Sequence, residues 1–211
     1  MRGNLRNMIN SPKFITFEGG EGSGKTTQSK MLYEYLISRG IKAIHTREVG
    51  GTPEAEKIRE ILVNSELHPI SELLLVMAAR YEHVTKIITP ALLDNIWVIC
   101  DRFIDSTICY QSYEDKLDAN KIYMLHDYLM GDIYPDLTFF MDVPPEIGLL
   151  RTANRENLNK FENRNMEFHE KVYQNFKCMA QRIKNRIVTI ECKDLTIEEI
   201  HQRILDNFKN F

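Results

Sequence analysis

The sequence has no long apolar run and no excess of either charge. None of its hydrophobic stretches approaches the roughly 18 residues that a membrane-spanning helix needs. Its 27 lysines and arginines are balanced by 30 acidic residues, which gives a net charge of −3 over 211 residues. These absences argue against a membrane partner and against a general attraction to nucleic acid or acidic lipid. The length suits one soluble domain, since about 100 to 200 residues is typical.

Cysteine is also scarce. The sequence has only four, and their spacing matches neither a metal site nor a dense disulfide framework. Cys100 lies in an apolar run, so buried free thiols in a reducing compartment, the cytoplasm, are the better interpretation. Residues 1–12 contain Arg2 and Arg6 but lack the apolar core of a secretory signal. We interpret them as a disordered extension before one domain over residues 13–211.

Five short apolar runs, rich in β-branched and aromatic residues, alternate with longer segments of helical spacing. These runs cover residues 14–17, 41–45, 96–100, 137–143 and 187–190. Strands that are apolar along their whole length are buried on both faces, which is typical of a parallel sheet covered by helices. The sequence therefore predicts an α/β three-layer fold with a parallel sheet of about five strands. Thr52 before Pro53, and Thr196 three residues before Glu199, predict helix N-caps.

Glycine is scarce too, but four of the ten glycines lie within six positions. Residues 14–27 read FITFEGGEGSGKTT, which fits the P-loop pattern G-x-x-x-x-G-K-[ST]. A predicted strand precedes this loop and a predicted helix follows it. The backbone N–H groups can therefore converge on phosphate oxygens at the positive end of the helix dipole. A glycine-rich turn that only reverses the chain is the alternative. The predicted triphosphate-binding residues are Gly19, Gly20, Glu21, Gly22, Ser23, Gly24, Lys25, Thr26 and Thr27.

A further absence concerns guanine recognition. The Asn-Lys-x-Asp motif of common GTPases is missing, because Asn120-Lys121 continues as Ile-Tyr and Asn159-Lys160 as Phe-Glu. In a P-loop, the lysine contacts the β- and γ-phosphates and the following hydroxyl ligates Mg²⁺. The loop therefore predicts a nucleoside triphosphate and Mg²⁺. It leaves motors, ATP-driven switches and small-molecule kinases open.

Charged side chains follow the third apolar run. Asp101 and Arg102 come directly after it, at the carboxyl edge of the predicted sheet, where open α/β sheets bind ligands. Asp101 can order Mg²⁺ and its waters, and the planar fork of Arg102 can hold a second phosphate group. A surface ion pair is the alternative, but an upstream P-loop favours one shared cleft. Arg47, Arg59 and Arg80 are further candidates for phosphate recognition.

Five ordered motifs resemble those of the bacterial-type thymidylate kinases, which belong to the P-loop nucleoside monophosphate kinases. They are FEGGEGSGKTT at 17–27, TREVGGT at 46–52, DRFIDST at 101–107, YQ at 110–111, and YPDLT with DVPPE between 134 and 146. The match runs from about residue 13 to the C-terminus. The resemblance implies transfer of the γ-phosphoryl group of Mg·ATP to dTMP, giving dTDP for dTTP biosynthesis, by a homodimer.

The resemblance also implies how dTMP is bound. Glu21 matches the acid beside the sugar 3′-hydroxyl, Tyr110 the ring against the deoxyribose, and Thr107 with Gln111 the positions that read the thymine edge. Arg102, Arg80 and Arg59 match arginines that bind the phosphate and the base, and Glu48 lines the same pocket. The predicted acceptor-binding residues are Glu21, Glu48, Arg59, Val76, Arg80, Arg102, Ser106, Thr107, Tyr110 and Gln111. The predicted metal ligands are Thr26 and Asp101.

The polar segment of about residues 151–165 resembles the lid of this family. Bacterial-type members lack a P-loop arginine and supply a catalytic one from the lid. Arg155 matches it best, so the resemblance implies Lys25, Asp101 and Arg155 as catalytic residues, with Arg151 and Lys160 as weaker candidates.

Three positions depart from the family pattern. Val76 stands where a phenylalanine usually stacks on thymine, Val49 where a proline is usual, and Asn159-Lys160 where the lid often has Asp-Arg. Val76 leaves open a kinase for a related acceptor, such as dUMP or a deoxynucleoside. A P-loop switch without an acceptor is a second alternative, but it leaves the motif at 101–111 unexplained.

Overall fold

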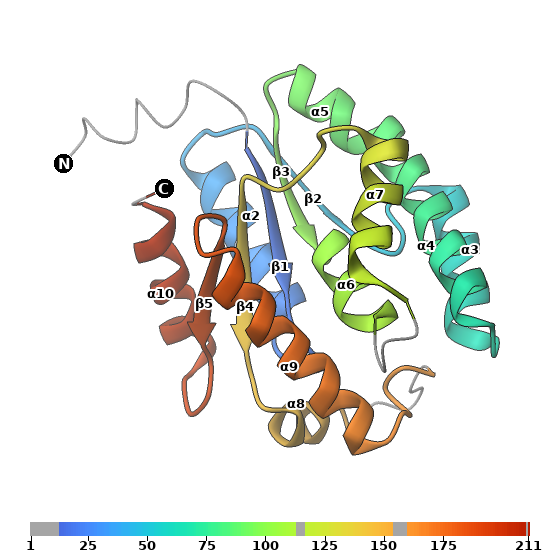
Figure 1. The fold of residues 1–211 in the computed structure, drawn as a ribbon. Coiled ribbons are helices and arrows are strands. Elements are labelled where there is room, and N and C mark those ends of the chain that lie inside the picture. The colour runs from blue at the N-terminus through green and yellow to red at the C-terminus, as the bar shows by residue number, and fades with distance from the viewer. Residues whose placement is uncertain (1–12, 113–116, 154–159, 210) are drawn as a thin grey trace.

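The computed structural model describes residues 13–112, 117–153, 160–209 and 211. Five strands form one parallel sheet in the order β2-β3-β1-β4-β5. They are β1 (Phe14–Glu18), β2 (Ala43–Arg47), β3 (Trp97–Asp101), β4 (Leu137–Asp142) and β5 (Ile187–Glu191). Each overlaps one of the five predicted runs. The predicted three-layer α/β fold is therefore confirmed (Figure 1).

Helices cover both faces of the sheet. On one face lie α2 (Lys25–Ser38) and α10 (Ile197–Phe208). The other face carries α4 (Pro69–His83), which continues through the π-helical turn η1 (Val84–Ile88) into α5 (Thr89–Leu93), together with α6 (Ile104–Gln111), α7 (Ala119–Met130) and α9 (Met166–Arg182). The remaining helices are α3 (Pro53–Asn64), which packs on α4, and α8 (Pro145–Thr152), which contacts α9.

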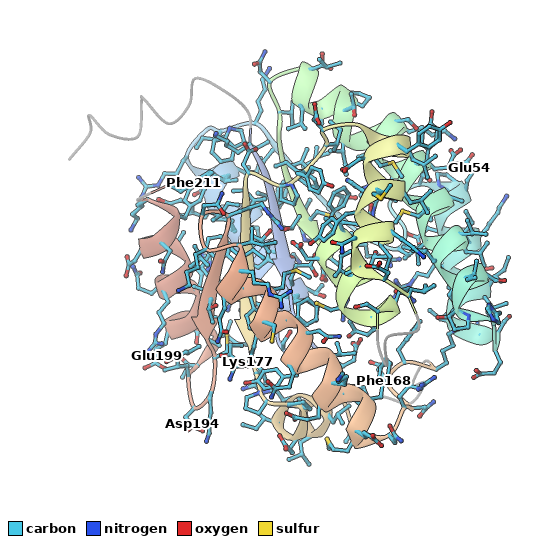
Figure 2. The ribbon with its side chains drawn as sticks, viewed as in Figure 1. Glu54, Phe168, Lys177, Asp194, Glu199 and Phe211 are labelled. Carbon is cyan, nitrogen blue, oxygen red and sulfur yellow. The ribbon has the colours of Figure 1, made fainter. Side chains whose placement is uncertain are left out.

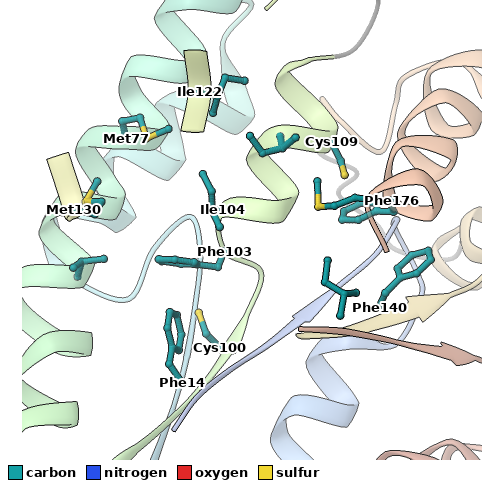
Figure 3. Packing of buried hydrophobic residues seen from close by; sticks show 14 of the residues in the cluster. Phe14, Met77, Cys100, Phe103, Ile104, Cys109, Ile122, Met130, Phe140 and Phe176 are labelled. Atoms are coloured by element: carbon teal, nitrogen blue, oxygen red, sulfur yellow. The ribbon is translucent and has the colours of Figure 1, made fainter. Parts of the chain in front are cut away.

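The strands bury side chains on both faces, as their apolar sequences predict. Ile15 and Phe17 of β1 belong to the cluster beneath α2 and α10, whereas Phe14 belongs to the cluster beneath α4, α6, α7 and α9. In that second cluster Phe14 meets Phe103 edge to face, with ring centroids 4.8 Å apart (Figure 3). Burial of each such ring contributes about 1.5–3 kcal/mol. Two independent cores thus hold the central strand, which carries the P-loop.

Two helix starts follow the predicted capping chemistry. Ala55 N–H donates to the Thr52 hydroxyl over 3.1 Å, with Pro53 at the first helical position. Thr196 and Glu199 form the predicted reciprocal capping box at the start of α10, where Glu199 lies on the outer surface (Figure 2). In the described part of the chain, no helix combines the length and apolarity needed to cross a membrane.

The sheet register positions the functional residues. In the β1–β3 pair Phe17 lies opposite Asp101, and in the β2–β3 pair Arg47 lies opposite Asp101. Because all strands are parallel, their carboxyl ends reach the same edge. The P-loop after β1, the loop after β2 and the Asp101–Arg102 pair after β3 therefore meet at one site.

Candidate active site

The P-loop leaves β1 at Glu18 and enters α2 at Lys25. Gly22 and Gly24 have φ angles of 65° and 90°, in the left-handed region where glycine carries no Cβ penalty. A Cβ on Gly22 would lie 2.0 Å from the carbonyl oxygen of Gly148 in α8, and a Cβ on Gly148 would lie 2.2 Å from that of Glu21. The loop therefore needs glycine on both sides of this contact. No motif in the sequence singled out Gly148, although a glycine inside a short helix is itself a signal.

Lys25 folds back over the P-loop. Its ammonium donates to the carbonyl oxygen of Gly20 over 2.6 Å and to the Ser23 hydroxyl over 3.1 Å. Burial, together with the nearby charge of Arg102, lowers the pKa of Lys25 to about 8. The chain holds this cation at the loop through neutral acceptors, which leaves its charge available to a phosphate.

Thr26, in the first turn of α2, meets Asp101 at the end of β3. The Thr26 hydroxyl donates to Oδ2 of Asp101, while Oδ1 of Asp101 is buried and has no hydrogen-bond partner in the described structure. A buried carboxylate oxygen without a donor is costly. A bound ligand would satisfy it.

A large cavity of about 680 Å³ opens over the P-loop. Seven of the nine predicted triphosphate-binding residues line it, and Gly19 and Gly20 lie outside the lining. Asp101 and Arg151 line it as well. We call this the donor cavity. Its walls combine backbone at a helix N-terminus with cationic side chains, which is the chemistry that phosphate groups require.

A smaller cavity of about 130 Å³ lies beside it, and we call it the acceptor cavity. Its lining includes all ten predicted acceptor-binding residues and five that were not predicted to bind the acceptor, namely Val49, Leu62, Val63, Phe103 and Phe161. The two cavities share Glu21, Glu48, Arg59 and Arg102. Ligands bound in the two cavities would therefore meet at these four charged side chains.

Arg102 lies at the junction of the cavities. Its guanidinium donates to Gly19 O and the Ser106 hydroxyl, each over 3.0 Å, and to Oε1 of Glu21 over 2.9 Å. Burial alone would raise the pKa of Glu21, but the charges of Arg102 and Lys25 outweigh it and lower the pKa to about 2. Glu21 is therefore an anion that fixes one side of the arginine fork.

Arg80 is the most deeply buried cation of the site, with 1% of its side chain exposed. Its Nε donates to Glu48 over 2.8 Å, its Nη2 donates to the Thr107 hydroxyl over 2.7 Å, and its guanidinium lies over the ring of Phe103. Glu48 also lies 3.1 Å from Nδ1 of His83, a partner the sequence analysis missed. Burial would raise the pKa of Glu48, but Arg80 and His83 together lower it. The charges of Arg80 and Glu48 on this wall of the acceptor cavity therefore offset each other without a ligand.

Tyr110 also lines the acceptor cavity. Its hydroxyl donates to Glu21 over 2.9 Å, and its ring meets Phe161 and Phe168 edge to face at 6.0 Å. Phe168 lies in the first turn of α9 (Figure 2). Arg59, which lines both cavities, donates to the carbonyl oxygen of Val49 over 3.0 Å.

The basic residues of the expected lid occupy different places. Arg151 lines the donor cavity. Lys160 instead contacts Glu72 of α4 and donates to the carbonyl oxygen of Ser65 over 2.8 Å. Arg155 lies outside the described residues, as do residues 1–12 of the expected extension.

A family model described as thymidylate kinase matches residues 17–204, most of the chain. The chain belongs to the thymidylate kinase family. Thymidylate kinases from Rickettsia africae and Rickettsia bellii are each 54% identical to it, over 94% and 90% of this chain and 98% and 93% of theirs. A crystal structure of thymidylate kinase from Ehrlichia chaffeensis, 38% identical, covers 94% of this chain and 99% of its own with a TM-score of 0.77. Family membership, expected from the five ordered motifs, is confirmed.

Proposed function

We propose that this protein is an ATP-dependent nucleoside monophosphate kinase that phosphorylates dTMP to dTDP, a step toward dTTP. The observation that carries the proposal is the pair of adjoining cavities. One is lined by a P-loop, the other by the ten acceptor-binding residues, and four charged side chains belong to both. A thymidylate kinase needs this arrangement, because the γ-phosphoryl group must pass directly from one nucleotide to the other.

The proposed mechanism depends on positioning and charge. Phosphoryl transfer spreads negative charge over the transferred group, so catalysis comes mainly from cations held in place. We assign Lys25 to the β- and γ-phosphates, and Arg102 to the acceptor phosphate at the junction. Lys25 is buried, Arg102 is half-buried, and both are hydrogen-bonded, which supports pre-organisation. Arg155 is our candidate for the lid cation, from the family resemblance, and Asp101 is our third candidate catalytic residue.

We also propose that Mg²⁺ is held by Thr26 and Asp101. The unpartnered Oδ1 of Asp101 supports this fit, since it offers a buried anionic oxygen next to a hydroxyl in the donor cavity. Mg²⁺ in kinase sites binds through one or two carboxylates with substrate phosphates and water, so no larger cluster of protein ligands is needed. When bound, the ion would supply positive charge that offsets the negative charge of the triphosphate.

We further propose that residues 13–211 act as one domain, within a homodimer, in the cytoplasm. Large apolar side chains are exposed on two packed helices, with Met124 and Tyr128 on α7 exposed by 69% and 85%, and with Ile70 and Leu74 on α4. A second copy would cover them. The four free thiols support a reducing compartment. Light scattering of the purified chain tests the dimer, and a monomer at micromolar concentration would refute it.

One assay tests the proposed reaction. Purified protein is mixed with Mg·ATP and, separately, with dTMP, dUMP, dCMP, dGMP and thymidine, and ADP release is followed. We expect rapid ADP release with dTMP and a phosphorylated product that co-elutes with dTDP. A preference for dCMP or dGMP would refute the assigned acceptor. ATP hydrolysis at the same rate with and without acceptor would refute a kinase altogether.

A further inference from the structure

Two polar side chains on α6 face the acceptor cavity one helical turn apart. Thr107 and Gln111 are separated by four residues, so they lie on the same side of the helix. The Thr107 hydroxyl oxygen accepts a hydrogen bond from Arg80 over 2.7 Å. Since a hydroxyl has one proton and arginine can only donate, the Thr107 proton is left to donate elsewhere. Arg80 therefore makes Thr107 a donor toward a ligand.

The amide of Gln111 is oriented in the same way by a different partner. Its Nε2 donates to Oε2 of Glu72 in α4 over 3.2 Å. A carboxylate can only accept, so the amide nitrogen must face Glu72 and the amide oxygen must point elsewhere. Within the described residues that oxygen has no hydrogen-bond partner, and Gln111 lines the acceptor cavity. Glu72 therefore makes Gln111 an acceptor toward a ligand.

Glu72 is itself held in place. The ammonium of Lys160 contacts the other carboxylate oxygen, Oε1, and also donates to the carbonyl oxygen of Ser65. The side chains of Lys160 and Glu72 are only 12% and 16% exposed. Partial burial strengthens an ion pair compared with one in open solvent. This series of side-chain contacts, Lys160–Glu72–Gln111, thus links the end of the expected lid to α4 and α6.

We propose that Glu72 is a positioning residue for base recognition, which fixes the Gln111 amide so that α6 presents a donor at Thr107 next to an acceptor at Gln111. This inference rests on the proposed function. A thymine or uracil edge, with a carbonyl oxygen beside a ring N–H, is complementary to that pair. The cytosine edge has an amino group beside a bare ring nitrogen, so its polarity is reversed. With the Gln111 amide fixed, a cytosine edge would leave hydrogen-bonding groups of the site unpaired, which is how such sites reject the wrong ligand.

Steady-state kinetics of Glu72→Ala with dTMP and dCMP tests the proposal. Without Glu72 the Gln111 amide can turn, so we expect the KM for dTMP to rise about tenfold, equal to about 1.4 kcal/mol, with kcat within about twofold. The ratio of kcat/KM for dTMP over dCMP should fall by a similar factor, and the KM for ATP should not change. Glu82→Ala is the matched control, since Glu82 lies on the same helix and pairs with Lys86 away from both cavities. It should behave as the wild type.

Two further variants keep the test decisive. Glu72→Gln retains an oxygen that can accept from Gln111, so it should keep most of the base discrimination and remains usable if the alanine variant does not fold. Lys160→Met should raise the KM for dTMP less, about threefold. In the double variant it should raise the KM no further than Glu72→Ala alone, because both changes act through the same orientation of Gln111. Unchanged discrimination in a folded Glu72→Ala enzyme would overturn the inference while leaving the kinase intact. A wild-type enzyme inactive on dTMP would refute the proposed function instead.

Discussion

The donor and acceptor cavities differ in how their polar groups are satisfied. In the acceptor cavity, including its junction with the donor cavity, nearly every charge has a protein partner: Arg80 with Glu48, Arg102 with Glu21, and Glu48 with His83. In the part of the donor cavity that is not shared, Lys25 is hydrogen-bonded only to neutral oxygens, and Asp101 keeps one buried oxygen without a partner in the described structure. The acceptor cavity and the junction are thus pre-organised by ion pairs, whereas the rest of the donor cavity depends on its ligand to complete its contacts.

The difference has an energetic consequence. Removing one member of a buried ion pair leaves an uncompensated charge, at a cost of about 3–5 kcal/mol. Changes in the acceptor cavity should therefore affect folding and ligand binding together. Changes in the donor cavity break fewer internal contacts, so they should reduce turnover while the fold is retained.

Lys25→Ala should have the largest effect on turnover. Its ammonium is proposed to stabilise charge in the transition state, so kcat should fall at least about 100-fold, while the KM for dTMP changes little. The coupled ADP-release assay measures both, and thermal unfolding should show a stable fold. Lys30→Ala, on the exposed side of the same helix, is the control. Turnover within a few-fold of wild type would remove Lys25 from the mechanism and weaken the contrast between the cavities.

Arg102→Ala should mainly weaken dTMP binding. Loss of the charged hydrogen bonds at the junction should raise the Kd for dTMP about 10- to 100-fold, and the melting temperature should fall because Glu21 loses its ion-pair partner. Isothermal titration with dTMP and with ATP separates the two ligands. Arg203→Ala removes an exposed arginine whose ion pair spans 4.0 Å, and serves as the control. An unchanged Kd for dTMP would contradict our assignment of this arginine.

The same contrast explains what the sequence could predict. The P-loop is contiguous, so its pattern alone locates Lys25 and Thr26, and the parallel register then brings Asp101 beside them. The apolar runs likewise locate all five strands. The acceptor cavity draws side chains from several helices and loops. Arg59, Arg80 and Arg102 could be proposed from their chemistry, but the other seven of its ten predicted residues came from a family resemblance, which identifies matched positions but not their supporting partners.

The residues that were missed are mostly such partners. His83, Glu72 and Phe161 look like an ordinary helical histidine, a helical acid and a loop aromatic, and only the tertiary packing shows what each contacts. Glu18 is a similar case. It is fully buried at the end of β1, where it accepts hydrogen bonds from Phe103 N–H over 2.7 Å and from Ser106 over 2.5 Å.

Titration of the buried Glu18 carboxyl makes the free energy of unfolding depend on pH. Burial and the neighbouring carboxylate of Asp105 raise the pKa of Glu18 to about 8 from an ordinary 4.5. A carboxyl group with a raised folded-state pKa contributes its stability fully below pH 4.5. That contribution is lost as the pH rises toward 8, because the unfolded chain ionises first.

Glu18→Gln removes this titration while keeping the shape of the protonated carboxyl. The difference in melting temperature, variant minus wild type, should therefore be larger at pH 8.5 than at pH 5. We expect an increase of about 3 °C or more, since 1 kcal/mol corresponds to about 2–4 °C in a chain of this size. Calorimetry at both pH values measures it. Glu34→Gln, at an exposed i,i+4 pair with Lys30, is the control. A difference that is flat or falls with pH would show that Glu18 is ionised in the folded protein.

Val76→Phe should have the smallest effect and tests how completely the acceptor cavity is organised. Val76 is nearly buried and lines that cavity, where an aromatic ring could lie against the base. An aromatic contact is worth about 0.5–1.5 kcal/mol, so the KM for dTMP should fall about threefold if the ring enters the cavity. The cavity holds only about 130 Å³, and Phe161 already contributes a ring, so overpacking acts in the opposite direction. A higher KM for dTMP with a lower melting temperature would mean that Phe161 and its neighbours already occupy the position an added ring would take, and that the valine is matched to them.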